Sequence, residues 1–266
     1  MRLNQRFLRT LTELTSNKEL SHLIGAFTKT KISRLLIPLY AKTYAIRVEE
    51  AEKPLNAYRT LNDFFIRRLK SGVRKIDQDS SSLVSPVDAT ITGIGRIDDH
   101  LTFTVKGQSY KIEELLEHSP YTQKYNKGCF IVLYLSPADY HRIHSPVTGT
   151  IIEKKHVLGK TYPVNEFGLK QMHKVLSRNE RLITYIRHKN GTIPVIKVGA
   201  MNVSSIKYSE SLQIHPSKGH ELAYFEFGST VVLLIENGIF EFCKGLGLGS
   251  KVFVGEPLGY WRVKDE

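Results

Sequence analysis

The sequence predicts an α+β fold: a mostly antiparallel β sandwich or barrel, preceded by an amphipathic helical segment. Two patterns carry this prediction. From residue 1 to about 70, apolar residues recur at helical spacing, whereas from residue 83 onward the period changes to two and β-branched residues dominate. With 266 residues, of which 41% are hydrophobic, the chain is long enough to bury a substantial core. We therefore expect a helical segment over residues 1–70 and a main domain over residues 71–266.

The helical segment is amphipathic and basic. Its apolar stripes are Leu3, Phe7, Leu11 and Leu14; Leu20, Leu23, Ile24 and Phe27; and Ile32, Leu35, Leu36 and Leu39. The cations beside them are Lys29, Lys31, Arg34, Lys42 and Arg47. Pro38 is expected to kink or end the third helix. Such helices pack on a neighbouring domain or lie on a membrane surface, and one helix can do each.

Beyond residue 83, alternating apolar residues and closely spaced turn signals predict strands. The candidates are Thr90–Ile94, Phe103–Lys106, Cys129–Leu135, Gly149–Ile152, Leu182–Arg187, Ile193–Val198 and Thr230–Glu236. A short helix is expected over Ile112–Glu117. The stretches Ser85–Ile91 and Ser145–Ile151 are identical at five of seven positions, which predicts two similar turn-and-strand units.

Composition narrows the class of partner. A net charge of +12 and a pI near 9.5 imply attraction to nucleic acid, an anionic bilayer surface or an acidic substrate. Only Cys129 and Cys243 are present, which makes a disulfide framework unexpected and a reducing compartment the default. No signal peptide and no run of about 20 apolar residues is evident, so contact with a membrane is expected from its surface.

Two segments carry acid–base side chains. Asp88 follows a proline-set turn at a strand entrance, where a lone aspartate commonly caps the turn. His141 and His144 lie three residues apart between two prolines, so they could share one face of a helical turn and bind a metal ion. No third ligand of fixed spacing accompanies them, so solvated or structural roles stay open.

A third segment pairs Gly228 with Ser229 at the start of a buried strand. Such a pair can be an ordinary turn, but it also permits intramolecular acyl transfer, in which the Ser229 hydroxyl attacks the Gly228 carbonyl. The hydroxyl needs a base, and a histidine held by a carboxylate is the usual solution. His144 and Asp88 are the candidates. Elimination from the resulting ester and hydrolysis would leave a pyruvoyl group and ammonia.

The ordered set of motifs resembles the phosphatidylserine decarboxylase family. It consists of SPVDAT at 85–90, SPADYHRIHSPVTG at 136–149 and FGSTVV at 227–232, with supporting stretches at 105–110, 162–165, 178–181 and 198–200. Any one motif is weak, but their order and separation are specific, and the similarity runs from about residue 55 to the end. Two positions depart from the usual pattern: Phe227 replaces a leucine, and Ala89 stands where glycine often follows the aspartate.

The resemblance implies a function and a site. Asp88, His144 and Ser229 would form a self-cleavage triad, and cutting between Gly228 and Ser229 would give a β chain of residues 1–228 and an α chain of residues 229–266. Ser229 would become a covalent pyruvoyl group, one per αβ unit. This group would take phosphatidylserine as a Schiff base and release phosphatidylethanolamine, with His141 assisting proton transfer. No metal ion is implied.

The resemblance also implies partners. The substrate is an anionic lipid, so we expect the αβ heterodimer to sit peripherally on the cytoplasmic face of the cell membrane, attracted by its basic helices. Whether two heterodimers pair stays open, and no nucleic acid is expected as a partner.

Several alternatives compete with this interpretation. Leu248-Gly249-Ser250 is a second candidate cleavage motif, but Lys251 replaces the threonine that usually follows. A lipoyl- or biotinyl-type carrier would explain the glycine-bounded stretch 254–259, yet Lys251 lacks the usual flanking residues. A zinc hydrolase would use His141, His144 and Asp88. A nucleic-acid-binding module would explain the charge, although no aromatic–basic RNA motif or helix-turn-helix is evident.

Overall fold

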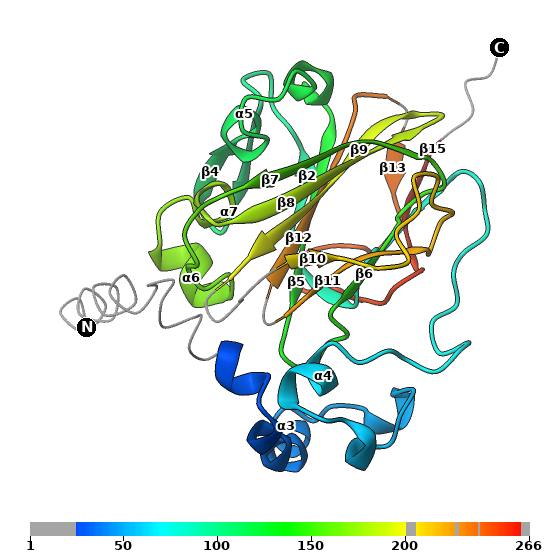
Figure 1. The fold of residues 1–266 in the computed structure, drawn as a ribbon. Helices are drawn as coiled ribbons and strands as arrows, with labels where there is room; N and C mark the ends of the chain where they lie inside the picture. The colour runs from blue at the N-terminus through cyan, green and yellow to red at the C-terminus, as the bar shows by residue number, and fades with distance from the viewer. Residues whose placement is uncertain (1–24, 201–205, 227–228, 239, 262–266) are drawn as a thin grey trace.

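The computed structural model describes residues 25–200, 206–226, 229–238 and 240–261, and Figure 1 shows how their elements are arranged. The strands are β1 (Ser82–Val84), β2 (Ala89–Arg96), β3 (Thr102–Val105), β4 (Gln108–Lys111), β5 (Cys129–Leu135), β6 (Arg142–His144), β7 (Thr150–Val157), β8 (Arg181–His188), β9 (Gly191–Gly199), β10 (Ile206–Tyr208), β11 (Glu221–Phe225), β12 (Ser229–Ile235), β13 (Phe240–Phe242), β14 (Lys251–Val252) and β15 (Pro257–Trp261). The α-helices are α3 (Ile37–Thr43), α4 (Leu61–Phe65), α5 (Ile112–Leu115), α6 (Glu166–Gln171) and α7 (Val175–Arg178). The 3₁₀ turns are η1 (Lys31–Leu36), η2 (Val48–Glu50), η3 (Leu55–Ala57) and η4 (Thr122–Tyr125). The predicted α+β class is confirmed.

A seven-stranded antiparallel sheet organises the main domain. Its order is β14-β2-β5-β12-β9-β8-β7, and β14 and β7 are its edges, so within the described residues this sheet is open and not a closed barrel. Three smaller sheets accompany it, with the orders β1-β15-β13, β10-β11-β6 and β3-β4. Figure 1 shows α5, α6, α7 and β4 beside one part of the large sheet and the strands β6, β10, β11 and β15 beside another.

Strand β12 lies at the centre of this sheet and is buried along its whole length. Its neighbours are β5 and β9. Val232 and Leu234 belong to the hydrophobic cluster that includes α5 and α7, whereas Val231 and Leu233 belong to the cluster that includes β11 and β15. A strand covered on both faces needs apolar residues at every position, which explains the uninterrupted run in its sequence.

The seven strands expected from the sequence are all present as β2, β3, β5, β7, β8, β9 and β12, and the helix expected from Ile112 is α5. The expectation that Pro38 kinks or ends the third helix is wrong. Pro38 lies in the first turn of α3, after the 3₁₀ turn η1, because a proline at that position gives up no intrahelical hydrogen bond. The sequence does not predict the other strands, which are two to five residues long and too short for a readable alternation, namely β1, β4, β6, β10, β11, β13, β14 and β15.

The repeated stretches Ser85–Ile91 and Ser145–Ile151 form equivalent, mutually bonded turns. Two reciprocal backbone hydrogen bonds join them: Val84 N–H to Pro146 O at 3.1 Å, and His144 N–H to Pro86 O at 2.8 Å. In each turn the serine hydroxyl donates to the carbonyl two residues on, at 2.7 and 2.6 Å. The expectation of two similar units is confirmed, and their contact brings the backbones before Asp88 and at His144 together.

The helical segment has a small core of its own. Ile37, Ala41, Ile46, Tyr58, Leu61 and Phe64 cluster there, and Ala138 of the main domain packs against them. Six large apolar side chains of the same segment are exposed, namely Phe27, Ile32, Leu35, Leu36, Leu39 and Tyr44. We call these six residues the exposed apolar patch. The stripes predicted at residues 3–14 and most of those at 20–27 lie outside the described residues.

No helix in the described part of the chain is long and apolar enough to cross a membrane.

Lys197 on β9 is a charged side chain enclosed by the core. It is fully buried, its Nζ donates to Thr184 Oγ1 at 2.5 Å, and it lies 5.3 Å from the centre of the Tyr208 ring. Burial lowers the pKa of Lys197 to about 7. The unfolded chain therefore binds a proton that the folded protein releases above pH 7.

Replacing Lys197 by methionine is expected to flatten the pH dependence of stability. Between pH 8 and 10, this lysine makes the free energy of unfolding rise by about 1.4 kcal/mol per pH unit, and the variant loses that slope. Urea unfolding of both proteins at pH 8, 9 and 10 measures the difference. Lys154→Met is the control, because Lys154 lies over the same Tyr208 ring from an exposed position. Equal slopes in wild type and Lys197→Met would contradict the assignment.

Candidate active site

Ser229 is the first residue of β12, in the middle of the large sheet. Its cross-strand neighbours are Leu135 on β5 and Gly199 on β9. The side chain is fully buried, and its hydroxyl has no hydrogen-bond partner among the described residues. Gly199 carries no side chain, so the hydroxyl has no cross-strand side chain beside it on β9. A buried hydroxyl without a partner costs about 1–3 kcal/mol, and such groups call for a functional explanation.

His141 carries a second buried polar atom without a hydrogen-bond partner among the described residues, its ring nitrogen Nε2. Its Nδ1 donates to the Asp139 carbonyl at 2.9 Å, which leaves the lone pair on Nε2, and Nε2 has no partner among the described residues. The ring lies against Phe65, with 4.0 Å between ring centres. Burial lowers the pKa of His141 to about 3. His141 is therefore neutral at pH 7, with the lone pair of Nε2 unbonded.

A backbone contact fixes His141 near the predicted cleavage point. Phe225 N donates to the His141 carbonyl at 3.0 Å, and Phe225 lies only three residues before Gly228. Phe227 and Gly228 themselves are outside the described residues. The backbone of His141 is thus held next to the chain that leads into Ser229.

His144 at the end of β6 is held in one tautomer. Its Nδ1 donates to the Gly219 carbonyl at 2.8 Å, and Nε2 accepts from the Tyr140 hydroxyl at 3.2 Å. Burial lowers the pKa of His144 below its usual value, and this outweighs the opposite effect of the bond to Gly219. His144 is therefore neutral at pH 7, with its basic lone pair on Nε2.

Asp88 is buried and bound by a guanidinium. Arg74 donates to both carboxylate oxygens, with Nε 2.9 Å from Oδ1 and Nη2 2.5 Å from Oδ2. Val254 N also donates to Oδ1, at 2.9 Å. In the equivalent turn, Lys218 N donates to Thr148 Oγ1 at 3.0 Å. Each of these two side chains thus accepts from the backbone of a distant segment, whereas the charge and the ion pair are particular to Asp88.

The structure brings the turns of Asp88 and His144 together but does not bond the three predicted triad residues in a row. The reciprocal contact between the repeated turns places the His144 backbone against Pro86, two residues before Asp88. The carboxylate that would orient His144 instead binds Arg74, and the Gly219 carbonyl orients the ring. No direct hydrogen bond between Asp88 and His144 occurs in the described structure, and the roles of Asp88, His144, Ser229 and His141 stay predictions.

Three residues of this region were missed by sequence reasoning. Tyr140 binds His144, and Arg74 holds Asp88. Glu226, which is buried two positions before Gly228, pairs with Lys29 of the helical segment at 2.8 Å and with Lys207 at 3.3 Å. Only Tyr140 carried a signal, since it lies inside the histidine motif. The others depend on pairings between distant segments.

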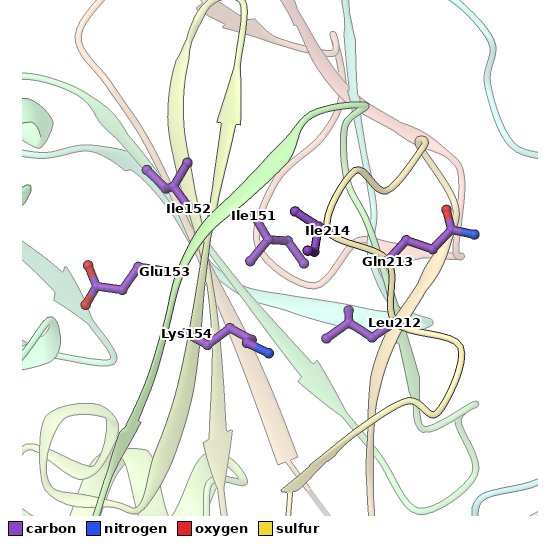
Figure 2. Close-up of a pocket in the computed structure, with 7 residues that line it drawn as sticks. All are labelled: Ile151, Ile152, Glu153, Lys154, Leu212, Gln213 and Ile214. Carbon is purple, nitrogen blue, oxygen red and sulfur yellow. The ribbon is translucent and has the colours of Figure 1, made fainter.

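Two pockets in the described structure are candidate ligand-binding sites. A pocket of about 220 Å³ is lined by Asp88 and Tyr140, and also by Ser136, which follows the cross-strand neighbour of Ser229. A different pocket, of about 370 Å³, lies between β7 and residues 212–214, and Figure 2 shows its lining side chains. Its lining includes none of the four predicted site residues, whereas the lining of the smaller pocket includes Asp88.

The zinc-hydrolase alternative requires free ring nitrogens on His141 and His144. Three of the four nitrogens of His141 and His144 are engaged by backbone carbonyls or by Tyr140. In the ranges that the structure describes, no group of three or more His, Cys, Asp or Glu side chains is placed to hold a metal ion.

Comparison with known proteins agrees with the motif resemblance. The family model for phosphatidylserine decarboxylase matches residues 61–260. A phosphatidylserine decarboxylase proenzyme of Geobacillus sp. (strain WCH70) is 47% identical over 255 residues, covering 96% of this chain and 98% of the relative. Proenzymes of the same name from Geobacillus kaustophilus and Anoxybacillus flavithermus are 47% and 44% identical, each covering 95% of this chain and, respectively, 96% and 95% of the relative.

These matches extend over nearly the whole length of each relative, and the family model includes the turns of Asp88 and His144 as well as Ser229. The chain belongs to the phosphatidylserine decarboxylase family of carboxy-lyases.

Proposed function

We propose that this chain is a proenzyme that cleaves itself between Gly228 and Ser229 and then decarboxylates phosphatidylserine to phosphatidylethanolamine. The observation that carries the proposal is the Ser229 hydroxyl, which is buried at the start of the central strand β12 without a hydrogen-bond partner among the described residues. Burial leaves both His141 and His144 neutral at pH 7, and the backbone of His141 is bonded to Phe225, three residues before Gly228. The names of the relatives support the same substrate and the same precursor state.

Self-cleavage needs one proton acceptor. The Ser229 oxygen bonds to the Gly228 carbonyl carbon and its proton passes to Nε2 of His144. His144 returns that proton to the peptide nitrogen as the carbon–nitrogen bond breaks, so an ester and a free amine replace the amide. Loss of the α-proton of residue 229 to water, with cleavage of its Cβ–O bond, then releases Gly228 as a carboxylate and leaves a dehydroalanine at position 229. Water converts this residue to the pyruvoyl group and ammonia. Tyr140 must release Nε2 of His144 for the first step, because it occupies that lone pair.

The residues around Ser229 fit a pyruvoyl group formed there. The position is enclosed, and Gly199 leaves it free of a neighbouring side chain on β9. When formed, the pyruvoyl group supplies a ketone for the lipid amine and accepts the electron pair released with carbon dioxide. His141 would assist the transfer of the proton that the product carbon gains after carbon dioxide leaves.

The two products of cleavage are expected to stay together as an αβ heterodimer. The α chain would have 266 − 228 = 38 residues and would begin with β12. This strand lies between β5 and β9, which both belong to the β chain. Separation would therefore open the centre of the core.

Intact mass spectrometry of the purified chain tests the proposal. Two fragments that meet at residues 228 and 229 are expected, with the small one blocked to N-terminal sequencing and reactive toward phenylhydrazine. The same sample should convert phosphatidylserine to phosphatidylethanolamine. An active, uncut chain with an ordinary serine at 229 would refute the mechanism.

We also propose that the helical segment binds an anionic membrane surface, on the cytoplasmic face. The exposed apolar patch lies among Lys29, Lys31, Arg34 and Lys42. Apolar side chains beside cations are the composition that inserts into a headgroup region, and each cation near an anionic surface adds about 1 kcal/mol of attraction. Through Lys29, the same segment contacts Glu226, two residues from the proposed cut.

Charged substitutions in the patch are expected to release the protein from vesicles. In Leu35→Glu/Leu39→Glu, two side chains that are 79% and 63% exposed lose their apolar character. We expect binding to vesicles with anionic lipid to fall at least about 10-fold. Co-sedimentation measures this, and turnover of a monomeric short-chain substrate should be unchanged. Leu158→Glu, at a similarly exposed position outside the patch, is the control. Unaltered vesicle binding of the double variant would rule out this surface.

A further inference from the structure

The pocket beside the candidate site is unusually rich in charge. Its lining includes four cations and three carboxylates, namely Arg47, Arg67, Arg74, Lys251, Glu50, Asp88 and Asp139. Its volume of about 220 Å³ is below the range of about 300–1,000 Å³ that is common for drug-sized ligands. The space therefore suits a small polar group and not an acyl chain.

Three of the four cations already have carboxylate partners. Arg47 pairs with Glu50 at 2.7 Å. Arg74 pairs with Glu50 at 2.8 Å and with Asp88 at 2.5 Å. Lys251 pairs with Asp139 at 2.5 Å. Arg67 makes no such pair among the described residues, so the lining carries one positive charge in excess.

Arg67 is also buried, with 4% of its surface exposed. Its Nη2 donates to the carbonyls of Ala138 and Asp139 at 3.1 and 3.2 Å, and its guanidinium lies 5.3 Å from the centre of the Phe64 ring. Nε and Nη1 are buried and have no hydrogen-bond partner in the described structure. A buried cation with unbonded donors destabilises the folded protein unless an anion pairs with it and accepts hydrogen bonds from those donors.

We propose that Arg67 binds the phosphodiester of the phospholipid headgroup in this pocket. The inference rests on the proposed function and deepens it. A phosphodiester carries one negative charge, which matches the single excess positive charge of the lining, and its oxygens suit the forked donors of arginine. Asp88 and Tyr140 line the same pocket, so a headgroup held there lies beside one candidate catalytic residue and beside the tyrosine that binds His144.

The carboxylate of the substrate is the less suitable partner. It loses its charge when carbon dioxide leaves, so a guanidinium bound to it would stabilise the starting state more than the transition state. The phosphodiester keeps its charge throughout. Arg67 should therefore affect KM and leave kcat nearly unchanged.

Binding can be tested without the cofactor. The probe is monomeric dihexanoylphosphatidylmethanol, which has a phosphodiester but neither an amine nor a carboxylate, titrated calorimetrically into the Ser229→Ala chain. Adding Arg67→Gln to this chain should raise the Kd for the probe roughly 10- to 100-fold. Arg67→Lys should raise it less, because lysine keeps the positive charge but replaces the forked guanidinium with a single ammonium group. Arg59→Gln removes an exposed charge of the same segment and should change Kd less than about twofold.

Each outcome decides the matter. Equal Kd values for Arg67→Gln and Arg59→Gln, with native circular dichroism for both, would overturn the proposal, and Arg67→Lys provides the comparison if the glutamine variant does not fold. Inorganic phosphate should compete only weakly; competition as strong as that of the lipid would indicate a free-anion site. In cleaved enzyme, a fall in kcat with unchanged KM would also contradict the assignment. The calorimetric test stands even if the wild-type chain proves uncut.

Discussion

Ser229→Ala is expected to leave the chain as one 266-residue polypeptide without decarboxylase activity. The substitution removes the only atom that the proposed acyl transfer uses as nucleophile, and with it the source of the pyruvoyl group. We expect activity to fall at least about 10⁴-fold, because residual catalysis by the remaining groups cannot replace a missing nucleophile. Intact mass spectrometry and a decarboxylation assay measure the two effects on the same sample.

The loss should come without unfolding. Ser229 Oγ has no partner in the described structure, so alanine at this position removes an unpaired buried hydroxyl and opens no hydrogen-bond network. The variant should be at least as stable as an uncut wild-type chain. An inactive but unstable variant would point instead to a structural role for the serine.

Ser250→Ala is the matched control, because Leu248-Gly249-Ser250 is the competing motif. Ser250 is partly exposed, and its hydroxyl already accepts from Gly247 N at 3.1 Å. We expect this variant to be cut and active like the wild type. Fragments that meet at residues 249 and 250, retained in Ser229→Ala and lost in Ser250→Ala, would move the site to the second motif.

The sequence predicted the parts of this fold that local pattern determines. Strands β5, β9 and β12 are long and apolar, so their position in the core could be read from composition. The equivalence of the two Ser-Pro-Val turns followed from their identity, and their mutual hydrogen bonds confirm it. The placement of Pro38 failed because a proline is compatible with the first turn of a helix as well as with its end.

The surroundings of the site could not be predicted in the same way. Arg74 precedes Asp88 by 14 residues, Lys29 is 197 residues from Glu226, and Gly219 is 75 residues from His144. No periodicity connects such positions, because their contact depends on how the sheets pack. Sequence reasoning therefore named candidate reactive groups, but not the groups that orient, neutralise or restrain them.

His144→Asn is expected to slow self-cleavage by about 10²- to 10⁴-fold, the usual range for loss of a general base. The asparagine amide can still donate to the Gly219 carbonyl, as Nδ1 does now, but it offers no basic atom in place of Nε2. The measurement is the rate at which freshly purified precursor disappears, followed by intact mass spectrometry. His118→Asn removes an exposed imidazole outside the site and should be cut normally.

The pH dependence separates a base from a structural residue. Burial lowers the pKa of His144 below its usual value of about 6.5, so wild-type cleavage should be constant from pH 7 to 8 and slow only as acid protonates the ring below that value. His144→Asn should lose this acid limb as well as the rate. If it is cut at the wild-type rate, His141 becomes the candidate base, because its Nε2 is the other imidazole lone pair in the region and has no partner among the described residues.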